Sequence, residues 1–183
     1  MFIQQNGIGV GYLQKEDIPL MVKWLSDPKV LEFYEGRDKT FDAERVQKKF
    51  FDRDDGVARC LVEHQGNKVG YIQFYPLDSQ SKDAFGYLDE AERIYGIDQF
   101  IGETGGWNKG IGTKLVKAVV SYLVDTHEAD RVVLDPRIEN KRAIRCYQKC
   151  GFSTVKVLYG HEYHEGEYHD NYLMEYKRGE DHY

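Results

Sequence analysis

The sequence has few cysteines, an excess of acidic over basic residues, and no long apolar run. Only three cysteines are present, at Cys60, Cys146 and Cys150. An odd, sparse set excludes the disulfide framework of a small secreted protein, so we expect a cytoplasmic location. No apolar stretch approaches the roughly 20 residues that cross a bilayer. The first residues lack the basic and apolar regions of a secretion signal, so we expect no membrane partner.

Basic charge is also scarce. The chain has 25 Lys and Arg against 31 Asp and Glu, a formal net charge of −6. Phosphate neutralisation needs clustered Lys and Arg, so we expect no nucleic-acid partner. An acidic cleft would attract a cationic substrate. A modest negative charge can equally serve only to keep a protein soluble.

The 183 residues contain no linker rich in Pro, Gly or Ser, no internal repeat and no low-complexity tract. We expect one domain over residues 1–183, with a sizeable core. Periodicity predicts an α/β (α+β) fold, a mixed central sheet flanked by helices. The expected strands are 8–13, 57–64, 68–75, 94–101, 131–134, 152–158 and 168–176. The expected helices open near 16 and 111 and span 41–51 and 140–150, and 76–92 is expected to be a loop.

A strand, a glycine-rich loop and a helix follow one another between Tyr95 and Leu123. The loop reads Trp107-Asn-Lys-Gly-Ile-Gly-Thr113. The first N–H groups of a helix lack partners and lie at the positive end of its dipole. Gly110 and Gly112 would let a pyrophosphate approach them closely, and Lys109 could add charge. Alone, such a loop is equally consistent with an ordinary helix start.

The loop resembles the acetyl-CoA pyrophosphate loop of GNAT acetyltransferases, whose consensus is Gln/Arg-x-x-Gly-x-Gly/Ala. Trp107 stands where that consensus has Gln or Arg, which removes one side-chain contact. The segment Asn140-Lys-Arg-Ala-Ile-Arg-Cys-Tyr147 resembles the second signature of the same family. The resemblance implies the GNAT acyl-CoA N-acyltransferase fold and acetyl-CoA as acyl donor, with no metal. It implies donor-binding residues Phe100, Ile101, Lys109, Gly110, Ile111, Gly112, Thr113, Asn140, Ala143 and Tyr147.

The chain is similar in particular to aminoglycoside 6′-N-acetyltransferases, including the acetyltransferase half of the bifunctional acetyltransferase–phosphotransferase enzyme. The segments that carry this are Tyr95–Phe100, Lys109–Leu115 and Arg142–Tyr147. We expect acetyl transfer only, to a cationic small-molecule amine, by a monomer or homodimer. The resemblance implies Asp98 as catalytic acid–base residue and Tyr147 as general acid. It implies Asp98, Asp135, Tyr34 and Asp83 as acceptor-binding residues, with Glu103 as a further candidate.

Other interpretations stay open on sequence alone. The acceptor could be a polyamine, a hydroxylysine or a protein amine, or the chain could be a non-catalytic module that binds acetyl-CoA or drugs. Without the resemblance, Asp135 would be read as a turn residue before Pro136. Tyr147 would be read as a core aromatic. His161, His164 and His169 lie in a polar segment that we predict to be a hairpin loop rather than a metal site.

Overall fold

A computed structural model describes residues 1–180 of the chain. Its helices and strands follow the predicted alternation closely. The strands are β1 (Ile3–Gln5), β2 (Ile8–Tyr12), β3 (Ala58–His64), β4 (Asn67–Pro76), β5 (Ile94–Ile101), β6 (Arg131–Leu134), β7 (Ser153–His164) and β8 (Glu167–Lys177). The helices are α1 (Ile18–Trp24), α2 (Pro28–Leu31), α3 (Ala43–Phe50), α4 (Ser79–Phe85), α5 (Ile111–His127) and α6 (Lys141–Lys149).

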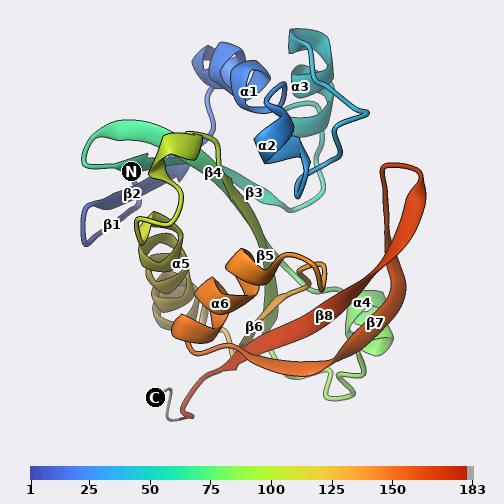
Figure 1. Cartoon of the computed structure of the whole chain (residues 1–183). Helices are drawn as coiled ribbons and strands as arrows, with labels where there is room; N and C mark the ends of the chain where they lie inside the picture. Colours follow the sequence, from blue (N-terminus) through green and yellow to red (C-terminus); the bar gives the residue numbers. More distant parts are fainter. Residues whose placement is uncertain (181–183) are drawn as a thin grey trace.

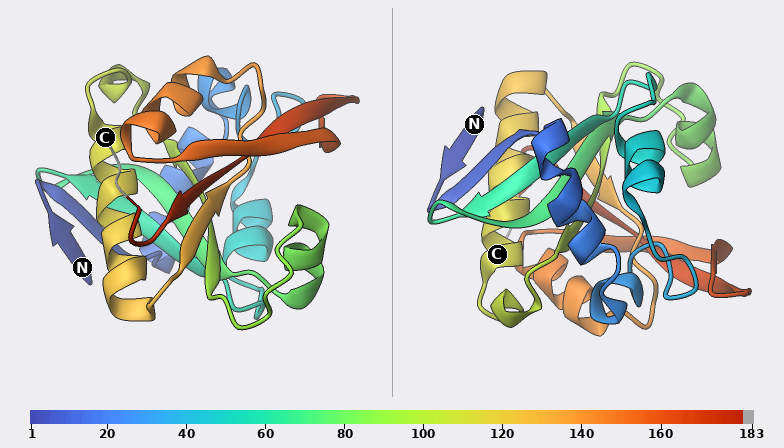
Figure 2. Two further views of the ribbon diagram at one scale, coloured as in Figure 1. Left: turned by 90° about the horizontal axis from the view of Figure 1, so that it is seen from below. Right: turned by 90° about the horizontal axis from the view of Figure 1, so that it is seen from above.

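The strands form one twisted sheet in the order β1-β2-β3-β4-β5-β6-β8-β7. Every neighbouring pair is antiparallel except β5 and β6, which are parallel. The mixed sheet flanked by helices that the sequence predicts is therefore confirmed. Figure 1 shows α1, α2 and α3 on one side of the sheet, and α5 and α6 on the other. The two views of Figure 2 show the same separation.

Strand alternation sends successive side chains to opposite faces of this sheet. On β4, Ile72 and Phe74 pack in the core beneath α5, whereas Tyr71 packs in the core beneath α1 and α3. On β5, Ile97 packs in the core beneath α5, and Phe100 packs in the core beneath α1 and α3. Neighbouring residues of β5 therefore reach opposite faces of the sheet, which matters for the site described below.

The parallel pair separates partway along its length. β5 pairs with β6 only over Ile94–Gly96, opposite Arg131–Val133. β5 then continues to Ile101 along β4, while β6 ends at Leu134. The last five residues of β5 thus have no strand on their β6 side. This split in the sheet positions the candidate site.

The predicted loop over 76–92 is wrong in part, because it contains the helix α4. Asp78 caps this helix by accepting a hydrogen bond from the backbone N–H of Ser81 at 2.8 Å. It ends at Gly86, which takes a left-handed conformation with φ of 87°. A polar segment of mixed spacing gave no helical periodicity, so the local cap was the only available signal.

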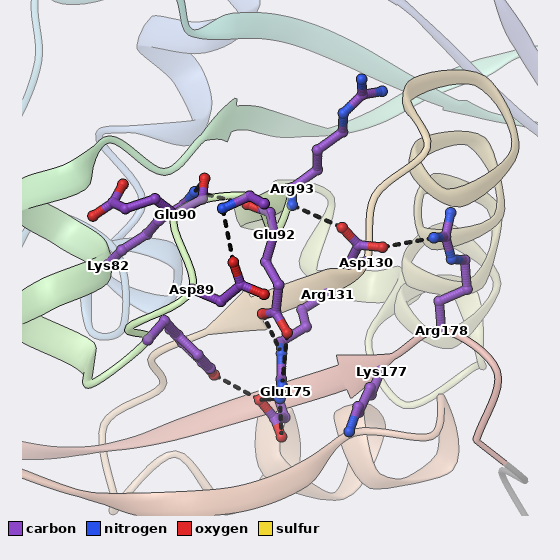
Figure 3. A network of polar contacts seen from close by, with 12 residues as sticks. Lys82, Asp89, Glu90, Glu92, Arg93, Asp130, Arg131, Glu175, Lys177 and Arg178 are labelled. Carbon is purple, nitrogen blue, oxygen red and sulfur yellow. Dashed lines mark hydrogen bonds and ion pairs between the residues drawn. The ribbon is translucent and has the colours of Figure 1, made fainter.

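A polar network fastens the segment after α4 to the sheet (Figure 3). Arg131 on β6 pairs with Glu92 at 2.8 Å and with Glu175 on β8 at 2.9 Å. The buried Lys82 donates to the backbone carbonyls of Glu90 and Glu92 at 3.2 and 2.7 Å. Buried charge needs such partners, and here the partners connect three elements that are distant in the sequence.

The closing strands are longer than predicted. β7 extends to His164 and β8 begins at Glu167, so the two form a hairpin arm that projects from the sheet (Figure 1). Only Glu165 and Gly166 remain as the turn. The predicted hairpin loop that carries the three histidines is therefore mostly strand. The polar residues do not oppose strand formation here, because both faces of the arm carry many half-exposed or exposed side chains.

Candidate active site

A cavity of about 760 Å³ lies where β5 and β6 separate. Its wall comes from α2, α3, β3, β4, β5, the start of α5, the segment after β6, α6 and the β7–β8 arm. Predicted site residues that line it are Tyr34, Asp98, Phe100, Ile101, Gly110, Ile111, Gly112, Thr113, Asp135, Asn140, Ala143 and Tyr147. The structure thus brings together residues that are more than 100 positions apart in the sequence.

One end of the cavity is the N-terminus of α5. Gly110 occupies the cap position with φ of 79°, a left-handed conformation that glycine adopts without strain. No side chain caps this helix. The first N–H groups, from Ile111 to Thr113, therefore have no partner within the helix and lie beside the cavity. A Cβ at Gly112 would stay 3.6 Å from Cys146, so the protein itself does not require glycine there. This geometry suits a phosphate group.

Asp98 lies in the middle of β5, on the part that has lost its β6 neighbour. Gln73, its antiparallel partner on β4, donates a hydrogen bond to its carboxylate at 3.0 Å. Burial and the nearby charge of Asp135 raise the pKa of Asp98 to about 6, although hydrogen bonds from Gln73 and Tyr75 oppose the rise. A carboxylate with this pKa is ionised at neutral pH and can still accept and release a proton.

Tyr147 reaches the cavity from α6 and meets β5 through Gln99. The amide Nε2 of Gln99 donates to the hydroxyl oxygen of Tyr147 at 2.6 Å. Burial raises the pKa of Tyr147 well above that of a free phenol, so the hydroxyl keeps its proton. Because Asp98 and Gln99 are adjacent on the strand, they project to opposite faces of the sheet. The split between the strands connects the two faces.

Acidic groups gather at the other end of the cavity. Asp135 follows β6, and Glu162 reaches in from β7. Nε2 of His161 lies 2.8 Å from the Asp135 carboxylate, and this hydrogen bond raises the pKa of His161. Arg137 pairs with Glu162 at 3.2 Å. Asp98 has only the neutral donors described above, so this end offers unneutralised negative charge to a cation.

The acidic residues that line the cavity near α2 and α3 are already in ion pairs. Glu35 forms an ion pair with Lys49, and Asp55 pairs with Arg59 at 2.8 Å. Tyr34 lines the same region with its ring centroid 4.7 Å from that of Phe100. Among the carboxylates that line the cavity, those of Asp98 and Asp135 are therefore the ones without a lysine or arginine partner.

Some predicted residues lie apart from this group. Asp83 is exposed on α4, and Lys109 precedes α5; neither lines the cavity. Glu103 instead accepts hydrogen bonds from Trp24 at 2.9 Å and Lys23 at 3.1 Å. Asn140 lines the cavity, but its side chain also caps α6 by accepting from the N–H of Ala143 at 3.3 Å.

Other contributors were not identified from sequence. Gln73, Tyr75, Gln99 and Glu162 line the cavity beside the predicted residues, as does Arg142. The alternation of side chains along β5 could have identified Gln99, the neighbour of Asp98 that faces the other side of the sheet. The others depend on the strand register and on the length of the β7–β8 arm, for which no local signal exists.

Within residues 1–180, no helix has both the length and the apolar character of a bilayer-spanning segment. The same residues hold no group of three or more His, Cys, Asp or Glu side chains placed to bind a metal ion. His161 pairs with Asp135, and His169 Nε2 lies 3.2 Å from the carbonyl oxygen of His164.

Comparison with known proteins agrees with this geometry. Residues 14–159 match the family model of the acetyltransferase (GNAT) domain. The chain is 29% identical over 150 residues to an aminoglycoside N(6′)-acetyltransferase type 1 of Klebsiella pneumoniae, covering 80% of this chain and 74% of that protein. Its structure resembles that of aminoglycoside acetyltransferase AAC(6′)-Ib in complex with coenzyme A and kanamycin, with a TM-score of 0.73 and 26% identity. That match covers 93% of this chain and 95% of the other.

A spermidine N-acetyltransferase of Vibrio cholerae, in complex with coenzyme A and spermine, also matches with a TM-score of 0.75. It covers 95% of this chain and 97% of the other, at 15% identity. At that identity the likeness shows a shared fold alone.

Proposed function

The chain belongs to the GNAT acetyltransferase family, and from this premise we propose that it transfers the acetyl group of acetyl-CoA to the 6′-amine of aminoglycosides. One observation carries the proposal. A single cavity joins the uncapped N-terminus of α5 to a group of carboxylates around Asp98 and Asp135. The first end suits the phosphates of the donor, and the second suits a polycationic acceptor. The relatives named above support the same pair of substrates.

Acetyl-CoA is a co-substrate in this proposal. Its pyrophosphate would accept hydrogen bonds from the backbone N–H groups of Ile111, Gly112 and Thr113. Its pantetheine arm would lie along the split between β5 and β6, past Ala143. This placement brings the thioester near both Asp98 and Tyr147.

The residues of the chain then divide the chemistry of transfer. Asp98 accepts a proton from the acceptor ammonium, and the freed amine attacks the thioester carbonyl carbon directly. The new C–N bond forms as the C–S bond breaks, and Tyr147 donates its proton to the departing thiolate. The second proton that the nitrogen loses as the amide forms restores the neutral phenol of Tyr147. N–H groups on the unpaired side of β5 would hydrogen-bond the carbonyl oxygen as negative charge develops there. No cysteine nucleophile is required.

The acceptor would be held by charge and by an aromatic wall. Asp135 would pair with an ammonium group of the aminoglycoside away from the reacting amine. Tyr34 would line the opposite side of the acceptor. Holding the amine in line with the thioester converts an encounter into a reaction within one complex.

A thiol-release assay with acetyl-CoA and a panel of amines tests the proposal. The sharpest comparison uses two aminoglycosides that differ only in carrying a 6′-amine or a 6′-hydroxyl. We expect turnover of the first and little of the second, and mass spectrometry should show one added acetyl group. Turnover of spermidine or of a peptide amine, with none of any aminoglycoside, would contradict the proposed acceptor. Expression in a susceptible bacterium should also raise the inhibitory concentration of the 6′-amine compound.

A further inference from the structure

Trp107 and Arg142 form a stacked pair in the wall of the cavity, near the start of α5. The guanidinium carbon of Arg142 lies 3.6 Å from the centroid of the Trp107 ring. Trp107 comes from the turn before α5, and Arg142 from the first turn of α6. The indole Nε1 donates to the backbone carbonyl of Ile101 at 2.8 Å, which fixes the ring to the end of β5. Both side chains line the cavity.

Within residues 1–180 the guanidinium of Arg142 has no carboxylate at ion-pair distance, although the more distant charge of Glu32 acts on it. Among residues 1–180, the stacking on Trp107 is the contact that Arg142 makes, and no carboxylate forms an ion pair with it. Burial lowers the pKa of Arg142, although an arginine remains charged throughout the physiological range. Of the other arginines that line the cavity, Arg59 pairs with Asp55 and Arg137 with Glu162, whereas Arg145 is exposed to solvent. A half-buried cation without an ion-pair partner lowers the stability of the fold unless an anionic ligand pairs with it.

The first turn of α5 packs against α6, the helix that carries Arg142. Thr113 Oγ1 and Cys146 Sγ are 3.5 Å apart, and Cys150 Sγ donates to the carbonyl of Thr113 at 3.5 Å. Arg142 is one helical turn before Cys146, so the two share a face of α6. Arg142 therefore projects from the face of α6 that contacts the first turn of α5.

We propose that Arg142, held flat against Trp107, binds the pyrophosphate of acetyl-CoA together with the N-terminus of α5. This rests on the proposed function, because it assumes acetyl-CoA as the donor. A guanidinium stacked on a ring keeps all of its N–H groups in the free plane, where they can reach two phosphate oxygens at once. Trp107 thus positions a cation from α6, at the place where the family consensus has a Gln or Arg in the loop itself.

Calorimetric binding of two ligands tests this assignment without turnover. Coenzyme A and 3′-dephospho-coenzyme A share the pyrophosphate and differ only in the 3′-phosphate. We expect Arg142→Gln to weaken both by the same factor, about tenfold or more, as for loss of a charge-assisted contact. Arg142→Lys keeps the charge but loses the planar fork and should fall between. Lys141→Gln removes one positive charge from the same helix, outside the cavity, and serves as the matched control.

Two results would overturn the assignment. If Arg142→Gln binds coenzyme A as tightly as the wild type, Arg142 does not contact the ligand. If affinity falls for coenzyme A alone, Arg142 binds the 3′-phosphate rather than the pyrophosphate. Trp107→Leu should also weaken both ligands while Arg142 is intact, and unchanged affinity would overturn the positioning role of the ring. Thermal unfolding of each variant separates these outcomes from misfolding. Absence of aminoglycoside turnover in a wild type that binds coenzyme A would contradict the proposed function alone.

Discussion

Gln99 Nε2 and the hydroxyl oxygen of Tyr147 are 2.6 Å apart, with the amide as donor. The bond occupies a lone pair of the phenol oxygen and leaves the phenol proton free to point into the cavity. Gln99 is thereby a positioning residue for the group proposed to protonate the leaving thiolate. The pair joins β5 to α6 beside the split in the sheet.

Removing the phenol proton should slow transfer with little effect on donor binding. We expect Tyr147→Phe to lower kcat by about 10- to 100-fold, the range of general acid catalysis. Gln99→Leu should lower kcat by about tenfold, as for one lost hydrogen bond, and leave KM for acetyl-CoA nearly unchanged. Steady-state kinetics with both substrates varied gives these parameters. A Gln99→Leu variant with wild-type kcat would contradict the positioning role.

Asp98→Asn should remove the proton acceptor and retain the fold. We expect kcat to fall about 100-fold or more, because the general base is lost, while coenzyme A binding stays intact. The pKa of Asp98 is about 6 in the folded state, which is above the pKa of an aspartate in an unfolded chain. Ionised Asp98 therefore destabilises the fold at neutral pH, and the neutral amide should give an equal or higher Tm.

Asp125→Asn is the matched control for that variant. Asp125 is exposed on α5 and does not line the cavity, so its kinetics and Tm should equal those of the wild type. Full activity of Asp98→Asn would refute the assignment of the base. A marked fall in Tm together with lost coenzyme A binding would show that Asp98 has a structural role instead.

The pH profile should report the same carboxyl group. Because Asp98 must be ionised to accept a proton, kcat/KM should fall as pH drops below about 6, the pKa of that carboxyl. Asp135 is a cause of the raised pKa, so Asp135→Asn should move this acidic limb to lower pH. The variant should also raise KM for a cationic acceptor, by weakening charge pairing. An acidic limb at the same pH in Asp135→Asn would contradict the coupling of the two carboxylates.

The sequence predicted those parts of the site that depend on local order. A strand, a loop with Gly110 and Gly112, and a helix are read directly from periodicity and turn chemistry, and all three are confirmed. The family resemblance supplied the candidate roles of Asp98 and Tyr147, which stay predictions. That both line one cavity follows from a register and a helix packing that no single segment specifies.

The contributors that were missed are defined by contacts between distant segments. Gln73 meets Asp98 because β4 and β5 pair in one particular register. Glu162 reaches the cavity only because β7 continues past residue 158 into a long arm. Arg142 stacks on the ring of Trp107, which lies 35 positions earlier in the sequence. Each depends on tertiary structure, which overrides local propensity.

Gly102, in the turn that leads into the phosphate loop, has no room for a side chain, so a substitution there should lower the stability of the fold. A Cβ on Gly102 would lie 2.2 Å from atoms of the Trp24 ring, which is itself 1% exposed. Trp24, the last residue of α1, could not retreat without losing its hydrogen bond to Glu103 and its packing in the core between the sheet and α3. We expect Gly102→Ala to lower the free energy of unfolding by about 1–3 kcal/mol, as for overpacking of a core. Gly105→Ala is the control, since a Cβ there meets no atom within 4 Å. Urea unfolding of both variants gives the difference, and equal stabilities would contradict the predicted clash.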